Sequence, residues 1–335
     1  MLARVAENMY WLSRYLERAE NTVRLIQVHS NLLMDLPGLD DHQSWIPLIS
    51  INGLDKEFAE VHVSATETSV NHFLLTDRDN PGSLINDFAA IQANLRSCRD
   101  IIPKTSYESI NSLCRLVSRE VESVYAQPSH RLVFLRDVED RLQSISGSLN
   151  SNMSHDLAYR VMRMGCYLER ADMTSRVIDV QSTRLSANYS SGELIAIQNQ
   201  RWVAVLRTLV AHQMYRQQLR RPVNGPDTLA FLLSDPGLPR SYAFCLNHLD
   251  DSFRKVGGSE APRKAVAALQ QKLDSAVYPT LANDPEKLHE FLDDLQLGML
   301  DVSAALSTAY FQSQDTVADD ESGIDQETAV LETSV

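Results

Sequence analysis

The sequence is poor in the motifs that mark the commonest catalytic and redox sites. Glycine occurs only 12 times in 335 residues, and neither a GxxxxGK[ST] loop nor a GxGxxG turn is present. The GxSxG elbow and the HExxH zinc motif are missing as well. The four cysteines form no CxxC pair, which favours reduced, buried thiols over disulfides or a zinc site. The nine histidines show no pairing that suggests catalysis, so we expect no metal site.

Long apolar runs are lacking too. No run approaches the roughly 18–20 residues that span a bilayer, and Arg4, Glu7 and Arg14 interrupt any signal-like core. We therefore expect a cytoplasmic protein without a membrane segment. The net charge of −13 argues against nonspecific nucleic-acid binding. Residues 314–335 carry seven acidic and no basic side chains, which is typical of a disordered acidic tail and leaves about −6 on the remainder.

Helical spacing dominates what is present. Apolar residues recur at steps of three and four from Leu2 to Ile26 and again from Leu157 to Ile178, and no alternating strand of useful length is found. The pattern predicts an all-α protein with helices near 2–36, 41–51, 55–75, 81–101, 105–126, 131–146, 156–185, 192–219, 226–234, 239–255, 259–276 and 285–313.

The chain also repeats itself. The segment 15–24 (YLERAENTVR) returns as 167–176 (YLERADMTSR), Trp45 is matched by Trp202, and 73–83 is matched by 231–241. Three ordered matches at offsets of 152, 157 and 158 indicate an internal duplication. We expect a helical bundle of two related halves with approximate two-fold symmetry, 1–150 and 151–313, followed by the tail at 314–335. The Ser- and Asn-rich stretch 147–155 marks the boundary.

The repeated segment places acidic and basic residues at the margin of each apolar stripe. Four acids and four arginines take part: Glu17, Arg18, Glu20, Arg24, Glu169, Arg170, Asp172 and Arg176. On a helical wheel Arg14 and Arg18 fall on the side away from the stripe. One interpretation is structural, with i,i+4 pairs and arginines that tie helices together. The other is a shared polar cleft that holds a zwitterionic or anionic ligand.

A second polar group occurs in the first half only. It consists of Asp77, Asn94, Arg96, Arg99 and Asp100. These residues are either caps and interhelical bridges or a one-sided extension of the same cleft. Such an asymmetry between the halves favours a ligand site in the first half.

These motifs resemble the bacterial alpha-E family, all-helical proteins with a Glu-Arg motif. The resemblance covers nearly the whole chain to about residue 313. It rests on residues 10–21 (YWLSRYLERAEN), 73–77 with 80–83, 94–100, Asn111 and 168–172.

The resemblance implies a protein without a settled activity. Family members are typically encoded beside, or fused to, a circularly permuted ATP-grasp protein, and a transglutaminase-like protein is often nearby. It therefore implies an accessory subunit of an ATP-grasp amide ligase that makes or modifies a small peptide. ATP and Mg²⁺ would be bound by that partner, and no cofactor is expected in this chain.

Two alternatives stay open. The chain could be an enzyme in its own right, with Glu17 and Glu169 as acid and base groups. It could also be a scaffold or homodimer whose Glu-Arg helices form the subunit interface.

Overall fold

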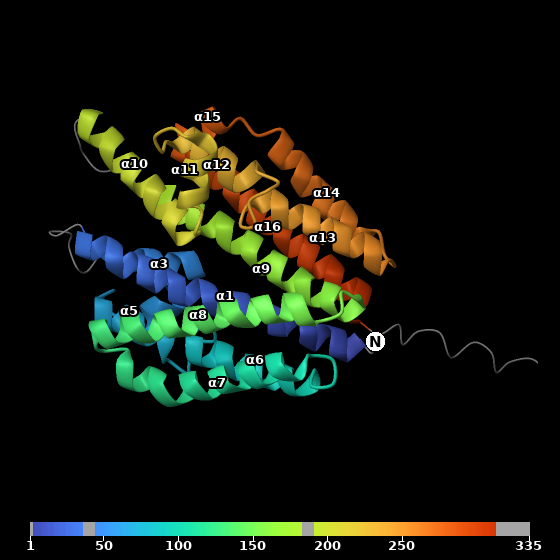
Figure 1. Cartoon of the computed structure of the whole chain (residues 1–335). Helices are drawn as coiled ribbons and strands as arrows, with labels where there is room; N and C mark the ends of the chain where they lie inside the picture. The colour runs from blue at the N-terminus through green and yellow to red at the C-terminus, as the bar shows by residue number, and fades with distance from the viewer. Residues whose placement is uncertain (1–2, 36–43, 183–190, 313–335) are drawn as a thin grey trace, which may run out of the picture.

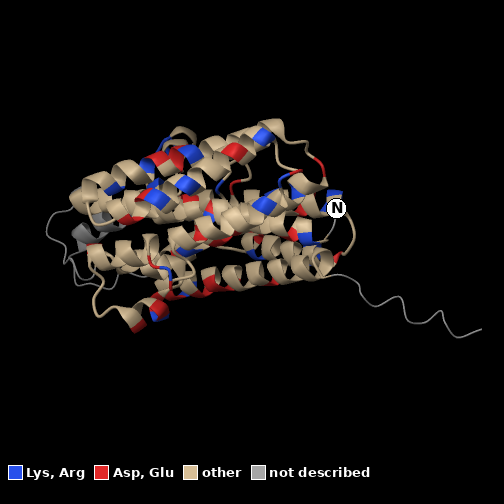
Figure 2. Cartoon of the chain, turned by 90° about the horizontal axis from the view of Figure 1, so that it is seen from below, with Lys and Arg blue, Asp and Glu red and all other residues tan. Residues whose placement is uncertain are grey.

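The computed structural model describes residues 3–35, 44–182 and 191–312, and within these ranges it holds fifteen helices and no strand. The expected all-α class is confirmed. Lys and Arg lie interspersed with Asp and Glu along the helices (Figure 2). None of the described helices is both long enough and apolar enough to cross a bilayer. The predicted tail at 314–335 lies outside the described residues.

Four long helices of the first half pack around one another. They are α1 (Ala3–Asp35), α6 (Leu84–Ser97), α7 (Lys104–Val124) and α8 (Pro128–Asn152). Three short helices lie between α1 and α6 in the sequence: α3 (Ile46–Asn52), α4 (Asp55–Val61) and α5 (Glu67–Leu75). Of these, α3 contacts both α1 and α9, so it reaches the boundary between the halves.

The second half has a similar set of four long helices. They are α9 (Leu157–Ser182), α13 (Tyr242–Val256), α14 (Ala261–Asp274) and α16 (Pro285–Tyr310). Four further helices cover one end of this set: α10 (Ser191–Thr208), α11 (His212–Leu219), α12 (Gly225–Ser234) and α15 (Tyr278–Ala282). The two sets lie side by side and meet along α1 and α9 (Figure 1).

The centre of the molecule is the contact between α1 and α9. Met9, Leu12, Ala19, Val23 and Ile26 of α1 are fully buried, as the three-and-four spacing predicts. Because α1 packs against α6, α8 and α9 together, its polar residues are enclosed as well. The Glu-Arg motif therefore lies in the interior of the protein.

A glycine sets how closely α1 and α9 approach. A Cβ added to Gly165 of α9 would lie 2.4 Å from the backbone oxygen of Tyr10, which cannot move without shifting α1. By contrast, a Cβ at Gly147 of α8 meets nothing within 4 Å. Gly165 is thus required by packing, whereas Gly147 is an ordinary helix-interior glycine.

We expect Gly165→Ala to lower the free energy of unfolding by about 1–3 kcal/mol, the usual cost of overpacking a filled contact. The matched control Gly147→Ala should raise it by roughly 0.5–1 kcal/mol, because alanine is the better helix former. Urea unfolding of the two variants measures both effects. Equal changes in the two proteins would contradict the close approach of α1 to α9.

Several expected helix boundaries differ from those observed. The helix expected at 55–75 is two helices, because Thr66 opens α5 with a capping box in which its hydroxyl accepts from the backbone of Ser69. The helix expected from Thr105 has Pro103 at its N-cap position and no side-chain cap. Asn80 does not cap α6; Ser83 occupies that position, while Asn80 Oδ1 accepts from the Gly82 amide at 2.9 Å.

Other differences concern helix length. The stretch 147–152, expected to be a connection, continues α8, so only Met153 to Asp156 joins α8 to α9. The helix expected at 192–219 is interrupted at Val210, which has a φ of 55°. The last long helix begins as predicted, with the Asp284 side chain accepting from the backbone of Lys287.

Candidate functional site

The two Glu-Arg motifs exchange partners across the contact of α1 with α9. Arg170 of α9 donates to both carboxylate oxygens of Glu17 on α1, at 2.8 and 2.7 Å. Arg18 of α1 donates in the same way to Glu169 on α9, at 2.7 and 3.2 Å. Each pair is bidentate, the geometry that gives arginine–carboxylate pairs both strength and orientation. The motif glutamate of each helix is therefore held by the motif arginine of the other helix.

The helical wheel placed Arg14 and Arg18 away from the buried stripe, and that expectation was incomplete. Both guanidiniums point at Glu169, with Arg14 Nε at 2.7 Å from its Oε2. The side of α1 opposite its apolar stripe is covered by α9, so Arg14 is largely enclosed and Arg18 is only partly exposed.

These contacts decide the charge state of the two glutamates. Burial alone would raise the pKa of Glu17, but Arg170 and its neighbours hold that pKa well below its ordinary value. The pKa of Glu169 is lowered for the same reason, with Arg14 as the strongest favourable charge. Both side chains are only 4 % exposed and remain ionised at neutral pH. Neither is suited to accept a proton in that range.

The residues around Glu17 form one closed cluster. The Glu17 cluster consists of Glu17, Glu20, Arg24, Glu139, Arg170 and Arg240. Arg24 bridges Glu20 and Glu139, with Nε 2.9 Å from Glu139 Oε1. Three carboxylates thus face three guanidiniums, and the charges of this cluster balance.

Two members of this cluster, Glu139 of α8 and Arg240, were not expected from the sequence. Arg240 lies between α12 and α13. It reaches in from the connection before α13 and donates to Glu20 Oε1 at 2.9 Å and to Glu17 Oε1 at 3.3 Å. Burial and the nearby Arg24 lower the pKa of Arg240 to about 10, so it still carries its charge at neutral pH. The sequence repeat could have identified Arg240, because Pro239-Arg240-Ser241 aligns with Pro81-Gly82-Ser83 in the first half.

The residues around Glu169 form a second cluster with a different balance. The Glu169 cluster consists of Arg14, Arg18, Glu169, Asp172 and Arg176. Arg176 Nε donates to Asp172 Oδ2 at 2.8 Å, which is the i,i+4 pair that the sequence predicts. Three guanidiniums here meet two carboxylates.

Asp87 of α6 is a further acid that interacts electrostatically with Arg18 and Glu169. Its side chain is fully buried, and neither carboxylate oxygen has a hydrogen-bond partner among the described residues. Burial raises the pKa of Asp87 well above its ordinary value, although the charge of Arg18 opposes this shift. Burial therefore favours the neutral form of Asp87. Burial also raises the pKa of Asp172, although the charge of Arg176 opposes this shift.

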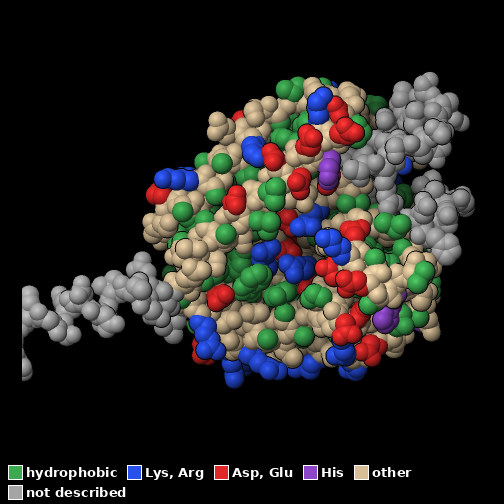
Figure 3. Space-filling model, turned by 180° about the vertical axis from the view of Figure 1, so that it is seen from behind, with side chains coloured by type: hydrophobic (Ala, Val, Ile, Leu, Met, Phe, Trp, Pro, Cys, Tyr) green, Lys and Arg blue, Asp and Glu red, His purple; other side chains and the backbone are tan. Residues whose placement is uncertain are grey.

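A cavity of about 340 Å³ opens beside the Glu169 cluster. We call it the Arg18 cavity; its polar and loop-borne walls are Arg18, Asn52, Gly82, Glu169, Asp172 and Arg176. Its volume falls in the range of about 300–1,000 Å³ typical of small-molecule sites. Charged side chains of both signs gather around a hollow near the middle of one face (Figure 3).

The guanidiniums are the groups that this cavity presents most openly. The side chains of Arg18 and Arg176 are 27 % and 29 % exposed, against 4 % for Glu169. Among the hydrogen bonds of the described residues, Nη1 of Arg18 and both terminal nitrogens of Arg176 make none. The Arg18 cavity can therefore hold a carboxylate or phosphate group by charge-assisted hydrogen bonds.

The Glu17 cluster lines a different and much smaller space. Glu17, Glu20 and Cys166 border a cavity of about 40 Å³, which has room for water only. The eight motif residues consequently do not converge on one shared cleft. Arg18, Glu169, Asp172 and Arg176 meet at the Arg18 cavity, whereas Glu17, Glu20, Arg24 and Arg170 belong to the closed cluster.

The second polar group is dispersed. Arg96, Arg99 and Asp100 are exposed at the end of α6 and just beyond it, and Asn94 Nδ2 donates to the backbone of its own helix. Asp77 lies in the connection between α5 and α6, near two histidines. None of these five residues lines the Arg18 cavity.

Fold and site together define an all-α protein whose halves are joined by exchanged glutamate–arginine pairs. The model of the Alpha-E family, described as a predicted alpha-helical domain with a conserved ER motif, matches residues 1–311. The chain belongs to this family, as the resemblance of its motifs indicated.

Curated relatives include uncharacterized proteins of Mycobacterium bovis and Mycobacterium tuberculosis. Each is 22% identical to this chain over 311 residues, which covers 87% of this chain and 34% of the relative. The chain thus spans about a third of the length of these relatives. No solved structure matches the chain.

Proposed function

We propose that this chain is the accessory, substrate-holding subunit of an ATP-grasp amide ligase that makes or modifies a small peptide in the cytoplasm. The absence of a nucleotide motif supports a division of labour in which the ligase binds ATP and Mg²⁺. The relatives support it too, because their matching segment is one part of a longer chain. A transglutaminase-like protein is a further candidate partner.

The observation that carries this proposal is the Arg18 cavity. It combines the size of a ligand site with unused N–H groups on two guanidiniums, those of Nη1 of Arg18 and of both terminal nitrogens of Arg176. The remaining oxygen of Asp172 and the amide oxygen of Asn52 can accept from an amino or amide group. A small peptide with a free carboxylate offers the matching chemistry.

We further propose that the two halves arose by duplication and that one of them retained the ligand site. At the contact of α1 with α9, position 14 corresponds to position 166, and position 82 corresponds to position 240. In the Glu169 cluster the third guanidinium comes from the helix, through Arg14. In the Glu17 cluster Cys166 stands at that helix position, and the third guanidinium comes from the connection, through Arg240. Glycine at position 82 then leaves the Arg18 cavity open.

The alternatives receive less support from the same contacts. General acid–base catalysis by Glu17 and Glu169 requires groups that exchange protons near neutral pH, and both pKa values are lowered. A homodimer built through the Glu-Arg helices requires exposed arginines, whereas Arg18 and Arg170 pair within the chain.

Co-purification with a circularly permuted ATP-grasp protein from the same organism tests the partnership, together with amide-bond formation measured with and without this chain. We expect a stable complex and at least a tenfold higher ligation rate when both proteins are present. Arg176→Ala should leave the complex intact but reduce that stimulation, because Arg176 faces the cavity. A ligase that neither binds the chain nor changes its rate or product would refute the proposal.

A further inference from the structure

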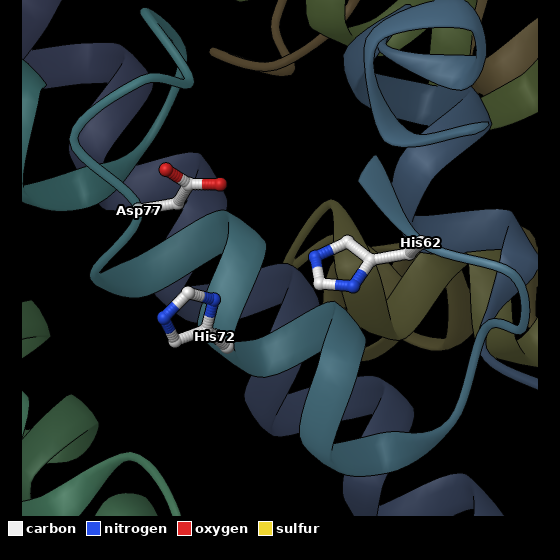
Figure 4. Close-up of side chains that lie close together, drawn as sticks. All are labelled: His62, His72 and Asp77. Carbon is white, nitrogen blue, oxygen red and sulfur yellow. The ribbon is translucent and has the colours of Figure 1, made fainter. Parts of the chain in front are cut away.

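Three side chains that are separate in the sequence meet on the first half of the molecule. His62 follows α4, His72 lies in the last turn of α5, and Asp77 lies in the connection that leads to α6. One ligand atom from each of the three residues lies within 4.8 Å of the other two (Figure 4). Their sequence spacings of 10 and 5 match no metal motif, so the sequence alone does not indicate a metal site here.

The two imidazoles are prepared for ligation. His62 Nε2 is buried and has no hydrogen-bond partner among the described residues. The rings are also held in place, with His62 against Phe58 at 4.7 Å and His72 against Tyr125 at 5.4 Å between ring centroids.

The carboxylate of Asp77 is positioned by the backbone. Its Oδ1 accepts from the amide of Asp79 at 2.9 Å, which fixes the side chain and leaves Oδ2 without a partner among the described residues. The set therefore offers two imidazole nitrogens and one carboxylate oxygen. An arrangement of this kind matches three protein ligands with a fourth position left for water.

We propose that His62, His72 and Asp77 bind one divalent transition metal of the zinc class. Imidazole ligands favour zinc and its neighbours, whereas magnesium and calcium prefer sites made of oxygen alone. In a tetrahedral zinc site the ligand atoms lie roughly 3.3 Å apart, given bonds of about 2.0–2.1 Å. The three atoms reach that spacing by side-chain rotation together with a small shift of the connections that carry His62 and Asp77.

Such a metal would hold in place two connections that line the Arg18 cavity. Asp77 lies in the connection that carries Pro81 and Gly82, both of which line that cavity. Leu54, another residue that lines the cavity, directly precedes α4, and His62 directly follows it. The metal would tie these two connections to the end of α5. This inference does not depend on the proposed partnership with a ligase.

Calorimetric titration of the metal-stripped full chain with Zn²⁺ tests the site. We expect one equivalent to bind and to raise the melting temperature, and Co²⁺ to give the visible absorption of a tetrahedral complex. His72→Ala and Asp77→Asn should each weaken binding at least tenfold. His155→Ala is the matched control, because His155 stacks on Tyr159 elsewhere on the surface, and it should bind as the wild type does.

Melting in the presence of a chelator shows whether each variant is folded, and His62→Gln serves as a third variant should one of the others not fold. Absence of stoichiometric Zn²⁺ binding would overturn the proposal. So would folded His72→Ala and Asp77→Asn proteins that bind Zn²⁺ with unchanged affinity.

Discussion

Glu17→Gln is expected to lower the free energy of unfolding at neutral pH by about 3–5 kcal/mol, the usual cost of removing one member of a buried ion pair. The substitution keeps the shape of the side chain but leaves Arg170 and Arg240 facing a neutral amide in the interior. Glu122→Gln is the control, because Glu122 pairs with Arg78 on the surface, where both side chains are more than half exposed. That change should cost less than about 0.5 kcal/mol.

The same variant should change how stability depends on pH. Because the folded pKa of Glu17 is lowered, its contribution is complete above the unfolded value of about 4.5 and is lost as the pH falls toward the folded value. Wild-type protein should therefore lose stability below about pH 4.5, and Glu17→Gln should lose less over the same range. Urea unfolding between pH 7 and pH 3 measures both quantities. A variant with wild-type stability and an unchanged acid slope would contradict the paired state of Glu17.

The contrast between the two kinds of ion pair shows what sequence spacing can predict. The pairs Glu20–Arg24 and Asp172–Arg176 lie within one helix, so the period of 3.6 residues predicts them and the structure contains them. The exchanged pairs between α1 and α9 were not predicted. A helical wheel gives the direction of Arg18 relative to its own helix, but it does not show which helix covers that side.

The candidate ligand site could be predicted only in part for the same reason. Arg18, Glu169, Asp172 and Arg176 were all selected, because they belong to the repeated motif. Gly82 was not selected as a site residue, since its contribution is the space that it leaves. Arg96, Arg99 and Asp100 were selected on their charge, yet they are exposed in the last turn of α6 and just beyond it.

Position 82 provides a direct test of the charge that the Arg18 cavity accepts. Its backbone is not in the left-handed region, and a Cβ there meets the flexible end of Leu54 at 3.1 Å and Asn80 Oδ1 at 3.5 Å. Longer side chains can therefore enter the cavity without strain in the backbone. Gly82→Glu and Gly82→Arg have similar reach and opposite charge, so a comparison of the two largely cancels the effect of filling the space.

We expect Gly82→Glu to be more stable than Gly82→Arg by about 1–2 kcal/mol. The introduced carboxylate can accept hydrogen bonds from the unused N–H groups of Arg18 and Arg176. An introduced guanidinium would instead be repelled by the three guanidiniums of the Glu169 cluster. Gly82→Glu should also weaken binding of an acetylated glutamate dipeptide at least tenfold relative to wild type, since its own carboxylate occupies the site. Chemical unfolding and calorimetry measure the two effects. Greater stability of Gly82→Arg, together with binding of a lysine peptide rather than the acidic one, would show that Glu169 and Asp172 dominate the cavity and that its ligand is a cation.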